Sequence, residues 1–126
     1  METQTYLSLV QEIYAGFGQG DLSPLLGAAA EDIVWSSHSH PSSPFHGVWR
    51  GAGALPEYFG NMAEIQLEKF DIHTMMEANN RVVALIEVRR ITTATGDITE
   101  GQFVHVLKFE GDKLTQVDIY EASADK

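Results

Sequence analysis

The chain has 126 residues, of which 18 are acidic and 8 basic, giving a formal net charge of −10, and it contains no cysteine. Such a chain repels phosphate groups, so we expect neither nucleic acid nor a membrane surface as a partner. The absence of cysteine excludes disulfides and thiolate chemistry. Length and composition predict one domain over residues 1–126. No basic leader precedes an apolar block and no apolar run reaches about 18 residues, so we expect a cytoplasmic protein.

The first half of the chain carries the helical patterns. Apolar residues recur three and four apart from Tyr6 to Phe17, which predicts an amphipathic helix that ends in the glycine-rich segment 16–20. A short second helix has Pro24 in its first turn. Residues 33–35 predict a short strand, and the Ser-, His- and Pro-rich segment 36–47 predicts a loop. A third helix follows, with Leu55, Tyr58, Phe59 and Met62 at helical spacing.

The second half of the chain alternates as strands do. We predict strands near 65–78, 81–94, 98–110 and 114–122, joined by turns at 79–80, 95–97 and 110–112. Several of these strands carry apolar residues on both faces. We therefore expect helices over one face of the sheet and a second copy of the chain over the other. The pattern predicts an α+β domain that forms a homodimer through its sheet.

Three stretches of the chain, taken together, resemble one known family. They are the end of the first helix from Phe17 to Leu22, the segments 30–35 and 47–51 around the loop, and the run from His105 to Leu114 with 118–120. In this order they resemble the SnoaL-like group of the nuclear-transport-factor-two-like superfamily, which includes ketosteroid isomerase and polyketide cyclases. The resemblance covers nearly the whole chain. It implies a cystatin-like, cone-shaped α+β barrel, in which a curved, mostly antiparallel sheet wraps around three N-terminal helices and leaves an internal pocket.

The resemblance also implies where catalytic groups would lie. The general-base aspartate of ketosteroid isomerase falls on Ser37, and its oxyanion-binding tyrosine falls on Ile13, beside Tyr14. Its protonated aspartate falls on His105. The acidic base that polyketide cyclases carry on their last strand falls on Ile119. The usual carboxylate base is therefore missing or displaced in this chain.

His105 is the leading catalytic candidate, because the cyclases that the chain resembles carry a histidine near this position. It shares one strand face with Phe103 and Leu107, where burial should lower the pKa of the imidazole and keep it neutral near pH 7. A neutral imidazole can polarise a carbonyl oxygen or accept a proton. The competing interpretation is a core histidine bonded to a neighbouring side chain.

The general base is the open point. Asp118 neighbours the cyclase position but points to the opposite strand face unless a bulge intervenes. His38 and His40 lie in the loop where ketosteroid isomerase places its base, and an imidazole from this loop could pair with His105. We predict no metal site, because no acidic residue completes the histidine doublet and cysteine is absent.

The remaining candidates bind ligand or pack the core. Tyr14 could present its hydroxyl to a ligand or serve packing alone. Arg89 and Arg90 lie on opposite strand faces, so at most one points inward. An inward arginine would indicate an anionic substrate, but we expect surface ion pairs. The residues predicted to line the pocket are Trp35, Ser37, His40, Trp49, Tyr58, Phe59, Met62 and Phe103.

Three functions fit these residues, and the last of them is a structural dimerisation domain that binds no ligand. The first is an acid–base enzyme of the isomerase, cyclase or dehydratase type, which needs no cofactor and acts on a small hydrophobic carbonyl compound. Its catalytic residues would be His105 and Tyr14, with His38 or Asp118 as base. The second is a binding or accessory domain with the same pocket and no chemistry, which the missing carboxylate favours.

Overall fold

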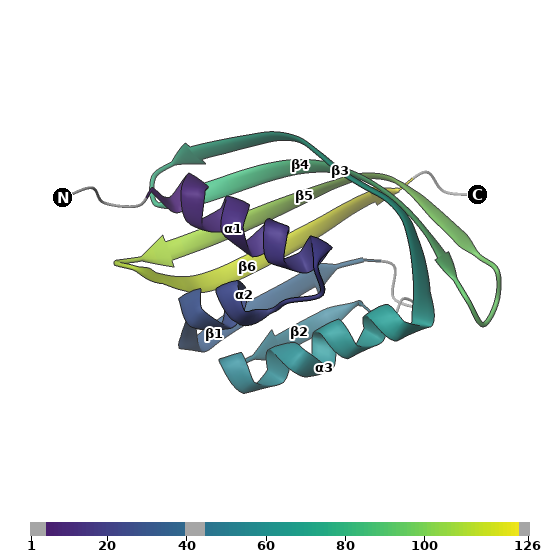
Figure 1. Ribbon diagram of the computed structural model, residues 1–126, viewed down its shortest axis with the longest axis horizontal. Coiled ribbons are helices and arrows are strands. Elements are labelled where there is room, and N and C mark those ends of the chain that lie inside the picture. The colour runs from purple at the N-terminus through teal and green to yellow at the C-terminus, as the bar shows by residue number, and fades with distance from the viewer. Residues whose placement is uncertain (1–4, 40–44, 124–126) are drawn as a thin grey trace.

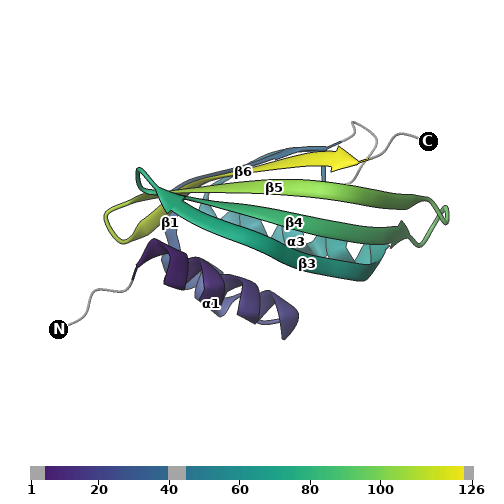
Figure 2. The same ribbon diagram turned by 90° about the horizontal axis from the view of Figure 1, so that it is seen from above.

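The computed structural model of the protein describes residues 5–39 and 45–123. Within these ranges the strands form a six-stranded sheet in the order β2-β1-β6-β5-β4-β3. The helices lie on one side of this sheet (Figures 1 and 2). The elements are α1 (Tyr6–Gly18), α2 (Ser23–Ala28), β1 (Ala29–His38), β2 (Gly47–Arg50), α3 (Leu55–Gly60), β3 (Ile65–Ala78), β4 (Arg81–Thr92), β5 (Ile98–Glu110) and β6 (Lys113–Ser123), with 3-10 turns at Ala52–Ala54 and Asn61–Glu64.

The predicted α+β architecture is confirmed. The four long strands end within two residues of the predicted limits. Asn79 and Asn80 have φ angles of 52° and 62°, as a two-residue hairpin turn of type I′ requires. The differences lie in β1 and β2. β1 runs on to His38, inside the predicted loop, because it pairs in parallel with β6. β2 begins at Gly47, where the predicted loop ends, and pairs antiparallel with residues 34–37 of β1.

Bulges help the sheet to curve. The pairing of β3 with β4 skips Glu68 and His73, and the pairing of β5 with β6 shifts after Lys108. An extra residue in one strand bends that strand, and β3 follows a visibly curved path towards α3 (Figure 1). The concave side of the sheet therefore faces the helices.

The core lies between the helices and one face of the sheet, which we call the inner face. On β4 the inner face consists of the even-numbered residues from Val82 to Arg90, all buried. On β5 and β6 it includes Phe103 and Ile119. The opposite, outer face carries Leu85 and Tyr120, which are 38% and 45% exposed. No helix among the described residues covers this outer face (Figure 2).

The described helices are short. The longest has 13 residues, whereas a helix that crosses a bilayer needs about 20. None of them is long and apolar enough to span a membrane.

Gly16 sets the close approach of α1 and the segment before α2. The Asp21 amide donates to the Gly16 carbonyl at 2.8 Å. A Cβ at position 16 would lie 2.5 Å from the Asp21 carbonyl oxygen and 3.2 Å from two ring carbons of Pro24. Glycine lets the chain turn back this closely because it has no Cβ. The contact holds the end of α1, including Tyr14, over the inner face.

Replacement of Gly16 by alanine should lower the free energy of unfolding by about 1–3 kcal/mol, because the added methyl group overlaps the Asp21 carbonyl. Gly18→Ala is the matched control. A Cβ at position 18 meets no atom within 4 Å, and alanine favours a helix over glycine by up to about 1 kcal/mol. Urea denaturation measures both variants. Equal stability of the two would contradict the tight packing at Gly16.

Candidate active site

A cavity of about 580 Å³ lies between the inner face of the sheet and helices α1 and α3. This volume is within the usual range for small-molecule pockets. Its wall is mostly apolar, with aromatic rings from α1, α3, β3 and β5. Among the described residues, the side chains that bring hydrogen-bonding or charged groups to this wall include Tyr14, Tyr58, Arg90, His105 and Glu121.

Tyr14 and His105 form a buried hydrogen bond of 2.7 Å between Oη and Nδ1. Tyr14 comes from the buried stripe of α1, and His105 comes from the inner face of β5. Both residues are at least nine-tenths buried, with 8% and 9% of their surfaces exposed. Their ring centroids are 5.9 Å apart. The fold therefore joins the two catalytic candidates that the sequence placed 91 residues apart.

Burial keeps both members of this pair neutral. It lowers the pKa of His105 to about 4, and it raises the pKa of Tyr14, with a smaller contribution from Tyr58. If Tyr14 donates to Nδ1, the Nε2–H group of His105 is the spare donor; if Nδ1–H donates to Tyr14, the tyrosine O–H group is the spare donor. Either tautomer leaves one neutral donor for a ligand oxygen.

A buried ion pair is the second polar feature of the wall. Arg90 Nη2 donates to both carboxylate oxygens of Glu121, at 3.1 and 3.2 Å. The two side chains are 9% and 5% exposed. The rings of Phe45 and Phe103 lie 4.8 and 5.4 Å from the guanidinium carbon and stabilise its charge. Burial raises the pKa of Glu121, while Arg90 opposes this effect.

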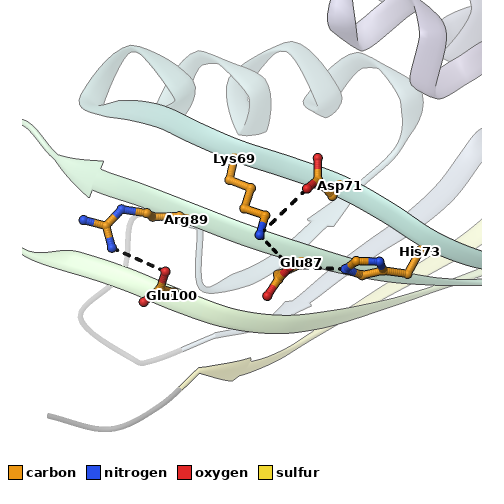
Figure 3. A network of polar contacts seen from close by, with 6 residues as sticks. All are labelled: Lys69, Asp71, His73, Glu87, Arg89 and Glu100. Carbon is orange, nitrogen blue, oxygen red and sulfur yellow. Dashed lines mark hydrogen bonds and ion pairs between the residues drawn. The ribbon is translucent and has the colours of Figure 1, made fainter.

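The positions of Arg90 and Glu121 correct the sequence analysis. Arg89 does form surface pairs. It contacts Glu68 at 2.7 Å, and it contacts Glu100 at 3.4 Å, as Figure 3 shows. Arg90 instead points inward, because it continues the even-numbered inner positions of β4. Glu121 was missed, although it follows Ile119 by two residues and therefore shares its strand face. The last strand thus does bring a carboxylate into the cavity.

Tyr58 stands beside two buried polar groups. Trp35 Nε1 and Ser37 Oγ make no hydrogen bond of good geometry with the part of the chain that the structure describes. Both approach the Tyr58 hydroxyl as hydrogen-bond donors and lower its pKa, but burial has the larger effect and leaves that pKa raised. The ring of Tyr58 also packs against Trp35 at 5.2 Å and Trp49 at 4.8 Å between centroids.

His38 and Asp118 lie on the outer face, away from the cavity. In the parallel pairing of β1 with β6, Ser37 stands opposite Ile119 on the inner side, so the residues next to them point the other way. His38 Nε2 is 3.5 Å from Asp118 Oδ1, with the histidine side chain 51% exposed. Its ring stacks on Tyr120 at 4.6 Å. Neither residue can therefore supply a base to this cavity, contrary to our expectation.

The other predicted pocket residues divide into three groups. Ser37 is buried beside Tyr58, and Trp49 packs against Tyr58 without lining the cavity. His40 lies outside the described residues. The residues that line the cavity as predicted are Trp35, Tyr58, Phe59, Met62 and Phe103.

A second hollow, of about 750 Å³, lies near the start of α1. Several of its polar side chains are engaged in hydrogen bonds with the main chain. The Tyr6 hydroxyl donates to the Gly111 carbonyl at 2.6 Å, and Glu77 accepts from the Leu7 amide at 2.9 Å. Lys113 donates to a main-chain carbonyl at 3.4 Å. We therefore place the candidate site in the inner cavity, where the buried titratable groups lie.

Comparison with protein families shows which family the chain belongs to. The model of the SnoaL-like domain matches residues 10–117. The chain belongs to the SnoaL-like family. A comparison of this SnoaL-like chain with curated proteins finds no match.

Solved structures share the fold of this SnoaL-like domain. One is an NTF2-like protein from Burkholderia xenovorans, 25% identical over 95% of this chain and 91% of that one, with a TM-score of 0.82. A candidate SnoaL-like polyketide cyclase from Mesorhizobium loti is 16% identical over 92% and 98%, with a TM-score of 0.73. TerC, co-crystallised with polyporic acid, is 19% identical over 91% and 89%, with a TM-score of 0.74.

The buried imidazole predicts how stability depends on pH. His105 has a pKa of about 4 in the folded protein and about 6.5 in an unfolded chain. Between these values the unfolded state binds the extra proton, so the free energy of unfolding falls as the pH falls from 6.5 to 4. The loss from this group alone should be about 3 kcal/mol.

His105→Gln should remove this part of the pH dependence, as measured by urea denaturation at several pH values. An unchanged slope in His105→Gln would show that the folded protein holds His105 in an ordinary aqueous environment.

Proposed function

We propose that this SnoaL-like domain is an acid–base enzyme that moves a proton on a small hydrophobic carbonyl compound without a cofactor. The observation that carries the proposal is the 2.7 Å hydrogen bond between Tyr14 and His105 in the wall of the cavity. The spare donor of this pair can bind a carbonyl oxygen. In a site without bulk water, such a donor stabilises the negative charge that grows on oxygen as an enolate forms.

Glu121 is the proposed base. It lies one inner-facing position beyond Ile119, which pairs with His105, a step of about 7 Å along the strand. Burial raises the pKa of its carboxyl group, which makes the carboxylate a stronger base. Glu121 would take a proton from the carbon next to the carbonyl, while Tyr14 and His105 hold the enolate oxygen. The proton on Glu121 would then return to the same or to a conjugated carbon, or first exchange with solvent, so that in D2O a deuteron is delivered instead.

The family supports this reaction type but does not select it. The relative from Mesorhizobium loti is named for a cyclase, and TerC was crystallised with a small organic molecule. One fold can serve many reactions, so the proposal rests on the residues of this cavity.

The proposal predicts that the protein speeds the exchange of the α-protons of β-tetralone in D2O, followed by NMR. Glu121→Gln should slow the catalysed exchange by roughly 10²–10⁴-fold, because it removes the base. Tyr14→Phe should slow it by roughly 10²-fold, because it removes a donor to the developing oxyanion.

Asp118→Asn is the matched control for the base. It makes the same change of carboxylate to amide on the same strand, but on the outer face, and should keep the parent rate. Exchange that never rises above the buffer rate, or that survives Glu121→Gln, would rule out this mechanism.

A binding domain without chemistry is the second candidate. It is favoured by Arg90, which lowers the pKa of Glu121 against the effect of burial and so weakens the carboxylate as a base. Ser37 also occupies the place where the resemblance to ketosteroid isomerase puts an aspartate. In this case β-tetralone would raise the melting temperature of the protein, while its proton exchange would stay at the buffer rate.

We also propose that the outer face of the sheet forms a homodimer. Leu85, Val104 and Tyr120 stand in one row across β4, β5 and β6, and His38 continues the row on β1. Two of these residues, Leu85 and Tyr120, are large and exposed. A second copy of the chain, related by a two-fold axis, would cover the row with the same residues.

Charged side chains of β3, β4 and β5, drawn in Figure 3, lie on the same outer face as this row and support a self-complementary contact. Lys69 and His73 contact Glu87 at 2.7 and 3.2 Å, and Arg89 contacts Glu100 at 3.4 Å. These exposed pairs add little to the stability of one chain. Positive and negative side chains alternate beside the row. The same surface of a second copy can therefore face them without large charge repulsion.

Leu85→Asp should convert the dimer into a monomer, because it places a charge in the centre of the proposed interface. Leu26→Asp is the control, since Leu26 is similarly exposed at 40% but lies on α2. Size-exclusion chromatography with light scattering measures both masses. A parent protein that is monomeric at all concentrations tested would contradict the dimer.

A further inference from the structure

Two buried groups at one end of the cavity lack hydrogen bonds that buried groups nearly always make. Trp35 Nε1 and Ser37 Oγ have no hydrogen-bond partner among the described residues, and their residues are only 4% and 3% exposed. An unpaired buried donor costs about 1–3 kcal/mol. Both approach the hydroxyl of Tyr58 closely enough to lower its pKa as donors, but without a well-formed hydrogen bond, and we call these three residues the Tyr58 group.

Tyr58 connects this group to the cavity. Its side chain lines the cavity, whereas Trp35 Nε1 and Ser37 Oγ are themselves covered. The indole N–H group can only donate, so its natural partner is the oxygen of Tyr58. When the Tyr58 oxygen accepts a hydrogen bond from the Trp35 N–H group, the O–H group of Tyr58 is left to donate into the cavity. A small movement of Tyr58, fixed by a ligand, would close these bonds.

The Tyr58 group is separated from the first donor pair. Ser37 is paired with Ile119, and Ile119 with His105, in one row across the sheet. Two strand spacings place the backbones of Ser37 and His105 about 10 Å apart. The cavity therefore offers hydrogen-bond donors at two places in a mostly apolar wall.

The neighbouring ion pair determines which charge a ligand can carry. Arg90 and Glu121 both act on the pKa of Tyr58, so they lie near this end of the cavity. Arg90 alone would attract an anion, but Glu121 neutralises it at 3.1 Å. The net charge of the whole chain, −10, also repels anions. From the sequence alone, an inward arginine would indicate an anionic substrate. Because Glu121 neutralises Arg90, the arginine does not have that meaning here.

We propose that the cavity selects an uncharged substrate with two oxygen functions on opposite sides of an apolar body. One is the carbonyl held by Tyr14 and His105. The other is an ether, hydroxyl or carbonyl oxygen that accepts a hydrogen bond from Tyr58, with Trp35 as a positioning residue behind it. This inference rests on the proposed carbonyl substrate and adds its second oxygen and its charge.

The test uses β-tetralone derivatives that carry a methyl, methoxy or carboxylate group at the ring position farthest from the ketone. Isothermal titration calorimetry measures their dissociation constants. The methoxy derivative should bind roughly tenfold more tightly than the methyl derivative, because only the methoxy oxygen accepts the hydrogen bond. The carboxylate derivative should bind most weakly of the three at neutral pH.

Variants separate the parts of this site. Tyr58→Phe should abolish the preference for methoxy over methyl. Trp35→Phe, which keeps an aromatic ring but removes the N–H group, should reduce the preference. Trp49→Phe is its matched control, because Trp49 packs against Tyr58 without lining the cavity, and it should keep the preference. Glu121→Gln frees Arg90, so the carboxylate derivative should gain roughly tenfold in affinity.

Equal binding of the methyl and methoxy derivatives by the parent protein would overturn the inference, because Tyr58 would then donate no hydrogen bond to the ligand and would bond to water instead. Tightest binding of the carboxylate derivative would overturn it as well, and so would failure of all three to bind. The proposed reaction is judged separately. A methoxy preference without proton exchange would remove only the reaction, and exchange without the preference would remove only the second oxygen site.

Discussion

The hydrogen bond between Tyr14 and His105 is the contact on which the cavity depends. It joins helix α1 to the centre of the sheet, and each partner satisfies a polar atom that the other would otherwise leave buried and unpaired. An unpaired group of this kind costs about 1–3 kcal/mol. The position of the helix and the protonation of the imidazole are therefore linked. A helix that docked elsewhere would leave a neutral histidine without a partner in an apolar wall.

Arg90 and Glu121 place the opposite kind of group in the same wall. Moving two charges out of water costs several kcal/mol for each ion, and apolar residues of similar size often stabilise a core equally well. Folding stability alone therefore does not explain a pair that is 9% and 5% exposed beside a cavity, and the pair lies where the proposed substrate would bind. Because the pair is neutral as a whole, it adds polarity to the cavity without adding net charge.

The SnoaL-like fold supplies the pocket, but the chemistry depends on which strand brings the polar groups. Ser37 occupies the position that the resemblance to ketosteroid isomerase assigns to a base, and it is buried beside Tyr58. The carboxylate comes instead from Glu121, at the far end of the last strand. The curved sheet brings both ends of the cavity against α1 and α3, so a base can move from one strand to another while the pocket is kept.

Local sequence patterns determined the secondary structure and the family of this protein. The apolar stripe of α1, the long alternating strands and the Asn79-Asn80 turn depend on residues close in sequence, and the alternation also placed His105 on an inner face. Only the tertiary structure decided that Tyr14 meets His105, that β1 runs parallel to β6, and that Arg90 and Glu121 face the cavity while His38 and Asp118 do not. These outcomes depend on the register between strands and on the docking of a helix. Both are set by contacts between residues far apart in the chain, which local periodicity does not encode.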